Sequence, residues 1–374
     1  MPSPHQHSID AIRLVPELRA VHLDRHPRTT PAKNLYFRAK YDLLEERADT
    51  AERVTTARAV RHLLTTCAST VELPEPLWIR FYPTWIVLAA ASRLGGLLHR
   101  RHRGPRRTVV HAMELTPFPV LLGGRHHLPR PVVAGARALV SLSVSTLVDR
   151  ICFASRASQD LYESLPMARR VTRRTMLELP ESCPGAEHTD ARPLSAVHVG
   201  LLAPRGGVHQ LLRAWEEIER AHPSAHLTVV GGGPLLPEVR RWADRAPTSR
   251  TATGPLPRPE VLDVVARNGV LVAPSVPEGR WREQIGLPIK EGLSTGATVV
   301  TTRQTGLSDW LEEHGHHVVD LVDDELIVDD LVTALSSALT RPLDRRGVRR
   351  SLPAVDGRIA SDAWLHSRAD APHA

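Results

Sequence analysis

The residues whose types and spacing best suit a chemical site lie between Ala273 and Gly296. A strand is predicted at Val270–Ala273, a loop rich in proline, serine and glycine follows it, and a helix is predicted at Pro288–Thr295. Proline suits the first turn of a helix, where its missing N–H is no loss, and glycine suits the position after the last turn. The free N–H groups and the positive dipole end of this helix therefore lie just after Gly286, where no side chain obstructs an anion.

Two carboxylates flank this helix start, with Glu283 before it and Glu291 within its first turns. Carboxylates accept hydrogen bonds from hydroxyl groups and are poor partners for phosphate. A backbone that binds an anion between two such carboxylates suits a sugar–diphosphate–ribose ligand. Each glutamate alone is more simply explained as a solvated acid that the helix dipole favours, and only the combined spacing favours a ligand site.

The chain on both sides of this segment alternates predicted strands and helices. A strand is predicted at Ala196–Gly200, a helix at Val208–His222, and a strand at Ala225–Val230 that runs into three glycines. Further helices are predicted at Leu235–Arg245 and Glu260–Arg267, and further strands at Thr251–Gly254 and Thr298–Thr302. Such units build a doubly wound parallel sheet whose ligands lie at the carboxyl ends of the strands. Gly200, Gly232 and Gly233 are therefore candidates for the same site.

The segment resembles the signature of the retaining family-4 glycosyltransferases. The resemblance rests on Glu283-x7-Glu291, with Pro274-Ser275 before it and Gly292–Val300 after it, and it extends over Ser195–Asp320. It implies the GT-B fold, an α/β architecture in which two Rossmann-like doubly wound domains face each other across a cleft. It also implies a nucleoside-diphosphate sugar as substrate, with UDP or GDP expected, and neither a cofactor nor a metal.

The resemblance also implies roles for single residues. Glu291 would bind the ribose hydroxyls, and Glu283 would lie near the transferred sugar as a catalytic residue. The backbone of Gln284, Ile285, Gly286 and Leu287 would hold the β-phosphate and the sugar hydroxyls.

Two positions depart from the family pattern. The family usually has an arginine directly after the glycine of the first strand and a lysine before the glycine that enters the next helix. This chain has Leu201 and Gly206 there. The guanidinium fork of Arg205 could replace one of these cations, or Arg205 is an ordinary solvated loop arginine. A degenerate protein that binds the nucleotide sugar without transferring it is therefore a second hypothesis.

The first half is expected to supply the acceptor side of the site. Asn34 and Tyr36 are predicted at the head of a helix over Pro31–Ala48, in a place that resembles an Asn-Pro-Tyr element of a family subgroup. They are more simply explained as a helix N-cap and a helix-face aromatic.

A strand predicted at Arg107–Leu115 carries two candidates for the group near the transferred sugar. Placing the valines of this strand in register puts Glu114 at its mouth, so Glu114 is the preferred candidate and His111 the spare. Side chains three apart on a strand point to opposite faces, so both cannot easily line one site. Polar residues at a strand end without a chemical role are the alternative.

A long helix predicted at Trp85–Arg101 is followed by several arginines. Such a helix could lie on a membrane surface. A buried crossover helix is the preferred interpretation, because apolar residues surround it almost completely.

The composition indicates a globular protein of two domains, with 374 residues, 42% of them hydrophobic, and a net charge of +7. Few aromatic residues argue against nucleic acid as a partner, and three cysteines without metal-ligand spacing fit a reducing cytoplasm. The first residues have no apolar run typical of a signal peptide, and the apolar stretch Trp85–Leu98 is shorter than the ~20 residues that span a bilayer.

The expected domains are an acceptor-binding domain at 1–185, a donor-binding domain at 186–345, and a tail at 346–374 that packs back on the first domain. Leu179–Arg192, rich in proline and glycine, is the predicted linker. The expected function is retaining transfer of a sugar to a small-molecule acceptor. The arginine-rich composition and the family resemblance suggest an actinobacterial natural product such as an antibiotic. The alternative is a lipid or polysaccharide glycosyltransferase at the membrane surface, although membrane association is not expected. A homodimer is left open.

Overall fold

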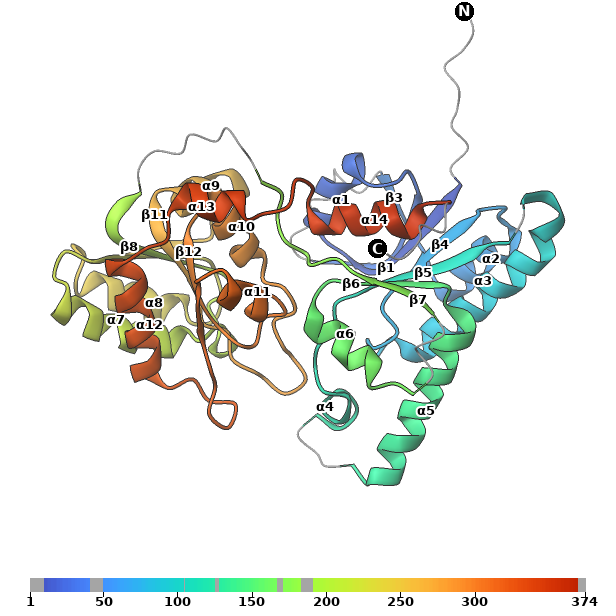
Figure 1. The fold of residues 1–374 in the computed structure, drawn as a ribbon, viewed down its shortest axis with the longest axis horizontal. Coiled ribbons are helices and arrows are strands. Elements are labelled where there is room, and N and C mark those ends of the chain that lie inside the picture. Colours follow the sequence, from blue (N-terminus) through green and yellow to red (C-terminus); the bar gives the residue numbers. More distant parts are fainter. Residues whose placement is uncertain are drawn as a thin grey trace, which may run out of the picture. The chain divides into compact units, whose positions relative to one another are not determined.

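The computed structural model describes residues 10–40, 50–103, 105–124, 128–166, 171–182 and 191–368. The chain forms two compact units: unit 1 consists of Met1–Met176 and Arg358–Ala374, and unit 2 of Leu177–Gly357 (Figure 1). The expected boundary between residues 185 and 186 and the third cysteine, Cys183, lie outside the described residues. The observed boundary comes earlier, directly after the last strand of unit 1.

Unit 1 contains a seven-stranded parallel sheet in the order β3-β2-β1-β4-β5-β6-β7. The strands are β1 (Ala11–Leu18), β2 (Lys33–Ala39), β3 (Ala51–Arg53), β4 (Thr70–Leu73), β5 (Arg107–Ala112), β6 (Arg150–Phe153) and β7 (Thr172–Thr175). The helices between them are α1 (Ala20–Arg25), α2 (Thr56–Thr65), α3 (Tyr82–Arg103), α4 (Phe118–Gly123), α5 (Arg130–Leu147) and α6 (Arg156–Glu163).

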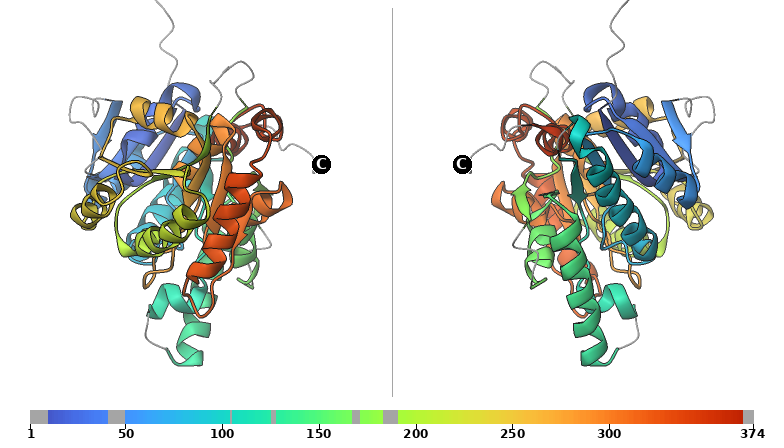
Figure 2. Two further views of the ribbon diagram at one scale, coloured as in Figure 1. Left: turned by 90° about the vertical axis from the view of Figure 1, so that its left-hand side faces the viewer. Right: turned by 90° about the vertical axis from the view of Figure 1, so that its right-hand side faces the viewer.

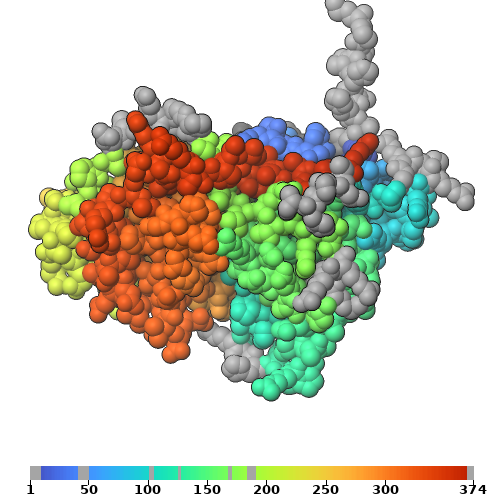
Figure 3. Space-filling view, in the orientation of Figure 1, coloured from blue at the N-terminus to red at the C-terminus, as the bar shows by residue number. Residues whose placement is uncertain are grey.

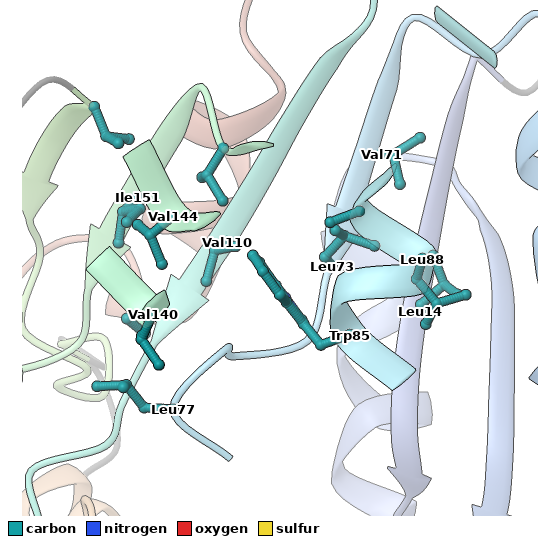
Figure 4. Close-up of a cluster of buried hydrophobic side chains, with 14 of the residues drawn as sticks. Leu14, Val71, Leu73, Leu77, Trp85, Leu88, Val110, Val140, Val144 and Ile151 are labelled. Atoms are coloured by element: carbon teal, nitrogen blue, oxygen red, sulfur yellow. The ribbon is translucent and has the colours of Figure 1, made fainter. Parts of the chain in front are cut away.

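The core of unit 1 lies between this sheet and the helices α2, α3 and α5. Trp85 of α3 is completely buried, and its indole N–H donates to the carbonyl oxygen of Pro74 at 2.9 Å. Figure 4 shows Trp85 among buried side chains from the sheet and from α5, including Leu73, Val110 and Val144. Burial of each such side chain is worth about 1.5–3 kcal/mol, so this layer fixes α3 and α5 on the sheet.

The helix predicted over Pro31–Ala48 is wrong in its described part, which is the strand β2; residues 41–49 lie outside the described residues. β2 pairs in parallel with β1, a strand that the sequence interpretation missed. The cause is the short apolar run from Leu35 to Phe37, because periodicity does not separate a short buried strand from a helical segment. Asn34 is therefore no helix N-cap, and Tyr36 lies on a strand.

Unit 2 contains a six-stranded parallel sheet in the order β10-β9-β8-β11-β12-β13. The strands are β8 (Arg192–Val199), β9 (His226–Val230), β10 (Arg250–Gly254), β11 (Asn268–Ala273), β12 (Thr298–Thr302) and β13 (His317–Val319). The helices are α7 (Val208–Ala221), α8 (Leu236–Asp244), α9 (Arg258–Ala266), α10 (Leu287–Thr295), α11 (Ser308–Glu313), α12 (Val328–Thr340) and α13 (Arg345–Arg350). The predicted alternation of strands and helices from residue 196 to 302 is confirmed.

The strand order of unit 2 reverses beside β8. The chain runs from β8 outward through β9 to β10, and then returns to β11 on the other side of β8. In doubly wound sheets the loops that leave the carboxyl ends of the two strands at such a switch point diverge and leave room for a ligand. The topology therefore directs attention to the loops after β8 and β11.

The helix α14 (Gly357–His366) returns to unit 1 after unit 2 is complete (Figure 3, red). Its Leu365 packs against Val109 and Cys152, whereas the neighbouring strand residues Val110 and Ile151 belong to the core beneath α3 and α5. Because side chains alternate along a strand, α14 covers the opposite face of the sheet.

A buried ionic network holds α14 in place. The Arg13 guanidinium, on β1, pairs with Asp362 of α14 and with Glu72 of β4, whose Oε2 lies 2.7 Å from Nε. Arg358 contacts the second oxygen of Glu72 at 2.5 Å. Burial opposes the charge on Glu72, but the guanidinium groups of Arg358 and Arg13 hold the pKa of this carboxyl well below its usual range. Glu72 is therefore held in its ionised form by the two guanidinium groups beside it.

Candidate functional site

The loops after β8, β9 and β11 meet at the carboxyl edge of the unit 2 sheet. The N–H of Gly200 donates to the Val230 carbonyl oxygen at 3.1 Å, and the N–H of Leu202 donates to that of Gly232 at 2.8 Å. A Cβ atom on Gly233 would lie 2.6 Å from the Leu202 carbonyl oxygen. The structure therefore brings together the predicted Gly200, Gly232 and Gly233.

Two further glycines make this approach of the loops possible. A Cβ atom on Gly231, whose φ is +146°, would lie 1.9 Å from the Gly200 carbonyl oxygen. A Cβ atom on Gly207 would lie 1.9 Å from the carbonyl oxygen of Pro274, in the loop after β11. Any other residue at either position would force the loops apart.

The start of α10 has the geometry that the sequence predicted. Gly286 is the N-cap, and Pro288 occupies the first turn. The carbonyl oxygen of Gln284 accepts from the Gly306 N–H at 2.8 Å, and that of Ile285 accepts from the Thr305 hydroxyl at 2.8 Å. These contacts fix the segment through its carbonyl groups, and the N–H groups of the first helical turn point along the helix axis toward its start.

Glu291 is buried on α10, with 6% of its surface exposed. Its carboxylate oxygen lies 3.4 Å from Nε of Arg258, the first residue of α9. Burial raises the pKa of Glu291, and the Arg258 guanidinium opposes this effect. The explanation of Glu291 as a solvated helix-start acid is therefore wrong. A buried carboxylate beside one partly exposed cation keeps acceptor sites for hydroxyl groups.

Arg205 lies in the short turn that follows β8, and it is half-buried. Its guanidinium carbon lies 4.7 Å from the ring centroid of Trp281, in the loop before α10. Its carbonyl oxygen accepts from the Val276 N–H at 2.9 Å. Arg205 is therefore fixed against the loop that leads to α10, which an ordinary solvated arginine would not be.

Leu201 and Gly206, the two positions at which the family usually has a cation, carry none in this chain. Leu201 is 44% exposed, and Gly206 completes the same short turn. Glu283 is half-buried in the loop that contains Trp281, and Leu287 is 41% exposed at the first position of α10.

Unit 1 carries a separate group of polar residues where β4 and β5 end. Oε2 of Glu75 accepts from the N–H groups of Met113 and Glu114 at 2.8 and 2.9 Å, and the Tyr162 hydroxyl donates to Oε1 at 3.0 Å. The Glu114 carboxylate itself accepts from the N–H of Thr116 at 2.9 Å. Burial and then the nearby Glu114 charge raise the pKa of Glu75 to about 8.

The two candidates from the predicted strand are arranged differently from the expectation. β5 ends at Ala112, so His111 lies on the strand and Glu114 lies beyond it in the loop. The alternation of strand side chains therefore does not apply to this pair, and it gives no reason why the two could not line one site.

The predicted acceptor-side residues take part in internal contacts. Asn34 is buried, accepts from an Arg13 N–H at 3.2 Å and donates to the Ala32 carbonyl oxygen. Tyr36 packs in a small cluster with Leu18 and Leu23. A contact of either residue with an acceptor stays a prediction.

Comparison with known proteins bears directly on unit 2. The family of group 1 glycosyl transferases matches residues 193–344. The matched stretch is less than half of the chain, and it lies within unit 2. The match includes the loops after β8, β9 and β11 and the whole of α10.

Curated relatives match a similar stretch of this chain. The chain is 28% identical over 174 residues to the sulfoquinovosyl transferase SQD2 of Arabidopsis thaliana, across 46% of this chain and 32% of the relative. It is 31% identical over 156 residues to a GDP-mannose-dependent α-(1-6)-phosphatidylinositol monomannoside mannosyltransferase of Mycolicibacterium smegmatis, across 40% of each. The chain thus spans less than half of the length of these relatives.

Solved structures are similar over almost the whole chain. Anabaena HepE in complex with UDP aligns with a TM-score of 0.63 at 14% identity, across 96% of this chain and 95% of that one. WaaG, a glycosyltransferase involved in lipopolysaccharide biosynthesis, aligns with a TM-score of 0.57 at 12% identity, across 96% and 100%. At this identity the likeness shows the fold, which is GT-B, with two Rossmann-like domains.

Sequence reasoning missed four residues of these two groups: Arg258, Trp281, Glu75 and Tyr162. Arg258 begins a helix after a strand, which is the usual position of ligand-binding residues, so a signal for it existed. The contact of Glu75 with residues 113 and 114 depends on β4 lying beside β5, which no local pattern reveals.

Proposed function

We propose that this protein is a retaining glycosyltransferase that takes its sugar from a nucleoside diphosphate bound at the carboxyl edge of the unit 2 sheet. The observation that carries the proposal is the buried Glu291 on α10, one turn from the helix start at Gly286. Glu291 would accept hydrogen bonds from the ribose hydroxyls. The N–H groups from residue 285 to the first turn of α10 would hold the diphosphate.

The departure of a nucleoside diphosphate requires stabilisation of the charge that develops on its β-phosphate. Fixed N–H dipoles aimed at that charge are among the strongest contributions that a protein makes. The start of α10 supplies such dipoles, and Arg205, held on Trp281, supplies one cation. Glu283 would bind the sugar, and an oxygen of the departing phosphate would take the proton of the acceptor hydroxyl. The proposal requires no metal ion.

Two acceptor classes follow from different observations. The family resemblance and the arginine-rich composition favour a small molecule, such as a natural product. A lipid is the second candidate, and it is favoured by the exposed apolar faces of α3 and α5, where Leu97 and Leu98 are 66% and 62% exposed. UDP and GDP are the donor nucleotides to test first, because a similar fold binds UDP and a curated relative depends on GDP-mannose.

Calorimetric titration of UDP, GDP and ADP into the full chain tests the donor site. We expect saturable binding of one nucleotide and a loss of roughly 10- to 100-fold in affinity for Glu291→Ala, the effect of removing hydrogen bonds to a charged group. Glu217→Ala, an exposed glutamate on α7, is the matched control and should bind as the wild type does. Absence of binding by a folded wild-type protein would overturn the proposal. Binding with neither transfer to an acceptor nor hydrolysis of the donor would leave only the degenerate nucleotide-sugar-binding protein, whereas transfer or hydrolysis above background would exclude it.

A further inference from the structure

The outward face of α3 is an apolar stripe. From Tyr82 to Leu98, each exposed residue is apolar, and these residues recur at helical spacing: Pro83, Val87, Ala90, Leu94, Leu97 and Leu98. Leu97 and Leu98 expose more than half of their surface. The helix is thus apolar all round, as its sequence indicated, but only one side of it is buried. The expectation of a buried crossover helix is wrong.

The neighbouring helix α5 has a similar face. Val132, Leu139 and Leu142 are 53%, 54% and 48% exposed. α3 and α5 lie side by side, and the Tyr82 hydroxyl is 2.8 Å from the hydroxyl oxygen of Ser143. Both helices connect successive parallel strands in the same direction across the sheet, so right-handed crossovers place them on one face. In Figures 1 and 2, the first turns of α5 extend beyond the sheet of unit 1.

We define the α3–α5 surface by these large exposed side chains: Val87, Leu94, Leu97, Leu98, Val132, Leu139 and Leu142. Proteins in solution rarely leave several large apolar side chains exposed along two helices of one face unless that face binds something. No helix in the described parts of the chain is long and apolar enough to cross a bilayer. An interaction with a membrane would therefore take place at its surface.

The charge around this surface identifies the partner. Between Pro76 and Val148 the chain has ten arginines and one acidic residue, Glu114. Neither α3 nor α5 contains an aspartate or a glutamate. Exposed arginines lie before α3 at Arg80, beside the leucines at Arg100, and at the start of α5 at Arg130. Two copies of this surface would bring like charges together, whereas anionic lipid headgroups would neutralise them.

We propose that the α3–α5 surface binds the interface of a membrane that contains anionic lipid, with its leucines and valines at the level of the upper acyl chains and its arginines among the headgroups. Helices that lie in a bilayer interface combine these two features. The proposal concerns unit 1 and does not depend on the nucleotide site of unit 2.

Flotation of the full chain with vesicles tests this surface. Vesicles of phosphatidylcholine alone are compared with vesicles that also contain phosphatidylglycerol. We expect binding to the anionic vesicles that weakens as salt is added. The double substitution Leu97→Asp with Leu98→Asp should lower the bound fraction roughly tenfold or more, because it places charges where apolar side chains enter the interface. Arg100→Glu should lower it less.

Matched controls come from unit 2. Val322→Asp and Arg350→Glu change an exposed valine and an exposed arginine there, and vesicle binding should stay as in the wild type. Urea unfolding of the double variant shows whether it is folded, and nucleotide titration separates failure of this proposal from failure of the donor site. Equal binding of the double variant, or no binding of the wild type, would overturn the proposal. Self-association of the wild type that these two substitutions abolish would also overturn the proposal, because a second copy of the chain would then cover the surface.

Discussion

The carboxylate of Glu291, on α10, lies 3.4 Å from the guanidinium Nε of Arg258, on α9. Glu291 is buried, whereas almost half of the Arg258 side chain is exposed. The charge of a buried carboxylate is thus partly neutralised by a side chain that is itself almost half exposed. We expect this pair to set how the proposed nucleotide site responds to pH.

Arg258→Ala should make nucleotide affinity more sensitive to acid. Burial raises the pKa of Glu291 and Arg258 opposes that rise, so its removal raises the pKa further. The ionised form exists above the pKa and is lost as the pH falls through it. Affinity should therefore start to fall at a higher pH in this variant, which calorimetry over a pH series would detect. Arg213→Ala, an exposed arginine on α7, is the control. Superimposable profiles of the variant and the wild type would contradict the assignment.

Arg205→Ala should weaken nucleoside diphosphate binding by roughly tenfold, the usual effect of losing one charge-assisted contact. A nucleoside monophosphate should bind almost as before, because it lacks the second phosphate. Trp281→Ala should have a smaller effect in the same direction, since it removes the ring on which Arg205 lies. Titration with UDP against UMP, or GDP against GMP, measures this difference. An equal loss for both nucleotides would place Arg205 elsewhere than at the second phosphate.

Gly231→Ala should destabilise unit 2 by about 1–3 kcal/mol, because φ is +146° and the added carbon would lie 1.9 Å from the Gly200 carbonyl oxygen. Gly135→Ala is the matched control. Gly135 lies in α5, with no atom within 4 Å of the added carbon, and alanine there should stabilise by about 0.5–1 kcal/mol. Urea unfolding of both variants gives the comparison. A stable Gly231→Ala protein would show that the loops after β8 and β9 have room to separate.

Glu75 should make unit 1 less stable as the pH rises. Its pKa is raised from 4.5 to about 8, so between these values the folded chain holds a proton that the unfolded chain has lost. The contribution of Glu75 to the free energy of unfolding is therefore greatest below pH 4.5, and it falls as the pH rises to about 8. Glu75→Gln should flatten this part of the profile in urea unfolding, whereas Glu163→Gln, an exposed residue on α6, should not. An unchanged slope for Glu75→Gln would show that the carboxyl is already ionised in the folded chain.

How far the sequence predicts this protein differs between the two units. Unit 2 was predictable because the strands β9 and β11 are short apolar runs followed by glycine or proline, and because Gly286 and Pro288 mark the start of α10. In unit 1 the short apolar run at Leu35 was interpreted as part of a helix. Only its pairing with β1 shows that it is a strand, and the sequence pattern does not reveal that pairing. The exposed leucines of α3 were predicted to be buried, because apolar character all round a helix does not reveal which side faces the core. The Glu75 contacts needed the strand order, and no spacing in the sequence supplies it.

The return of α14 to unit 1 has a consequence for the order of events during synthesis. The residues that neutralise Arg13, namely Glu72 and Asp362, are separated by the whole of unit 2. During translation, unit 2 is a continuous stretch and can fold as it emerges from the ribosome. The sheet of unit 1 is synthesised earlier, but one of its faces stays uncovered until α14 emerges. Until then the guanidinium of Arg13 lacks Asp362, one of its two acidic partners. The helix α14 therefore completes unit 1 only after all of unit 2 has been synthesised, and the sheet face that carries Arg13 and Val109 stays uncovered until then.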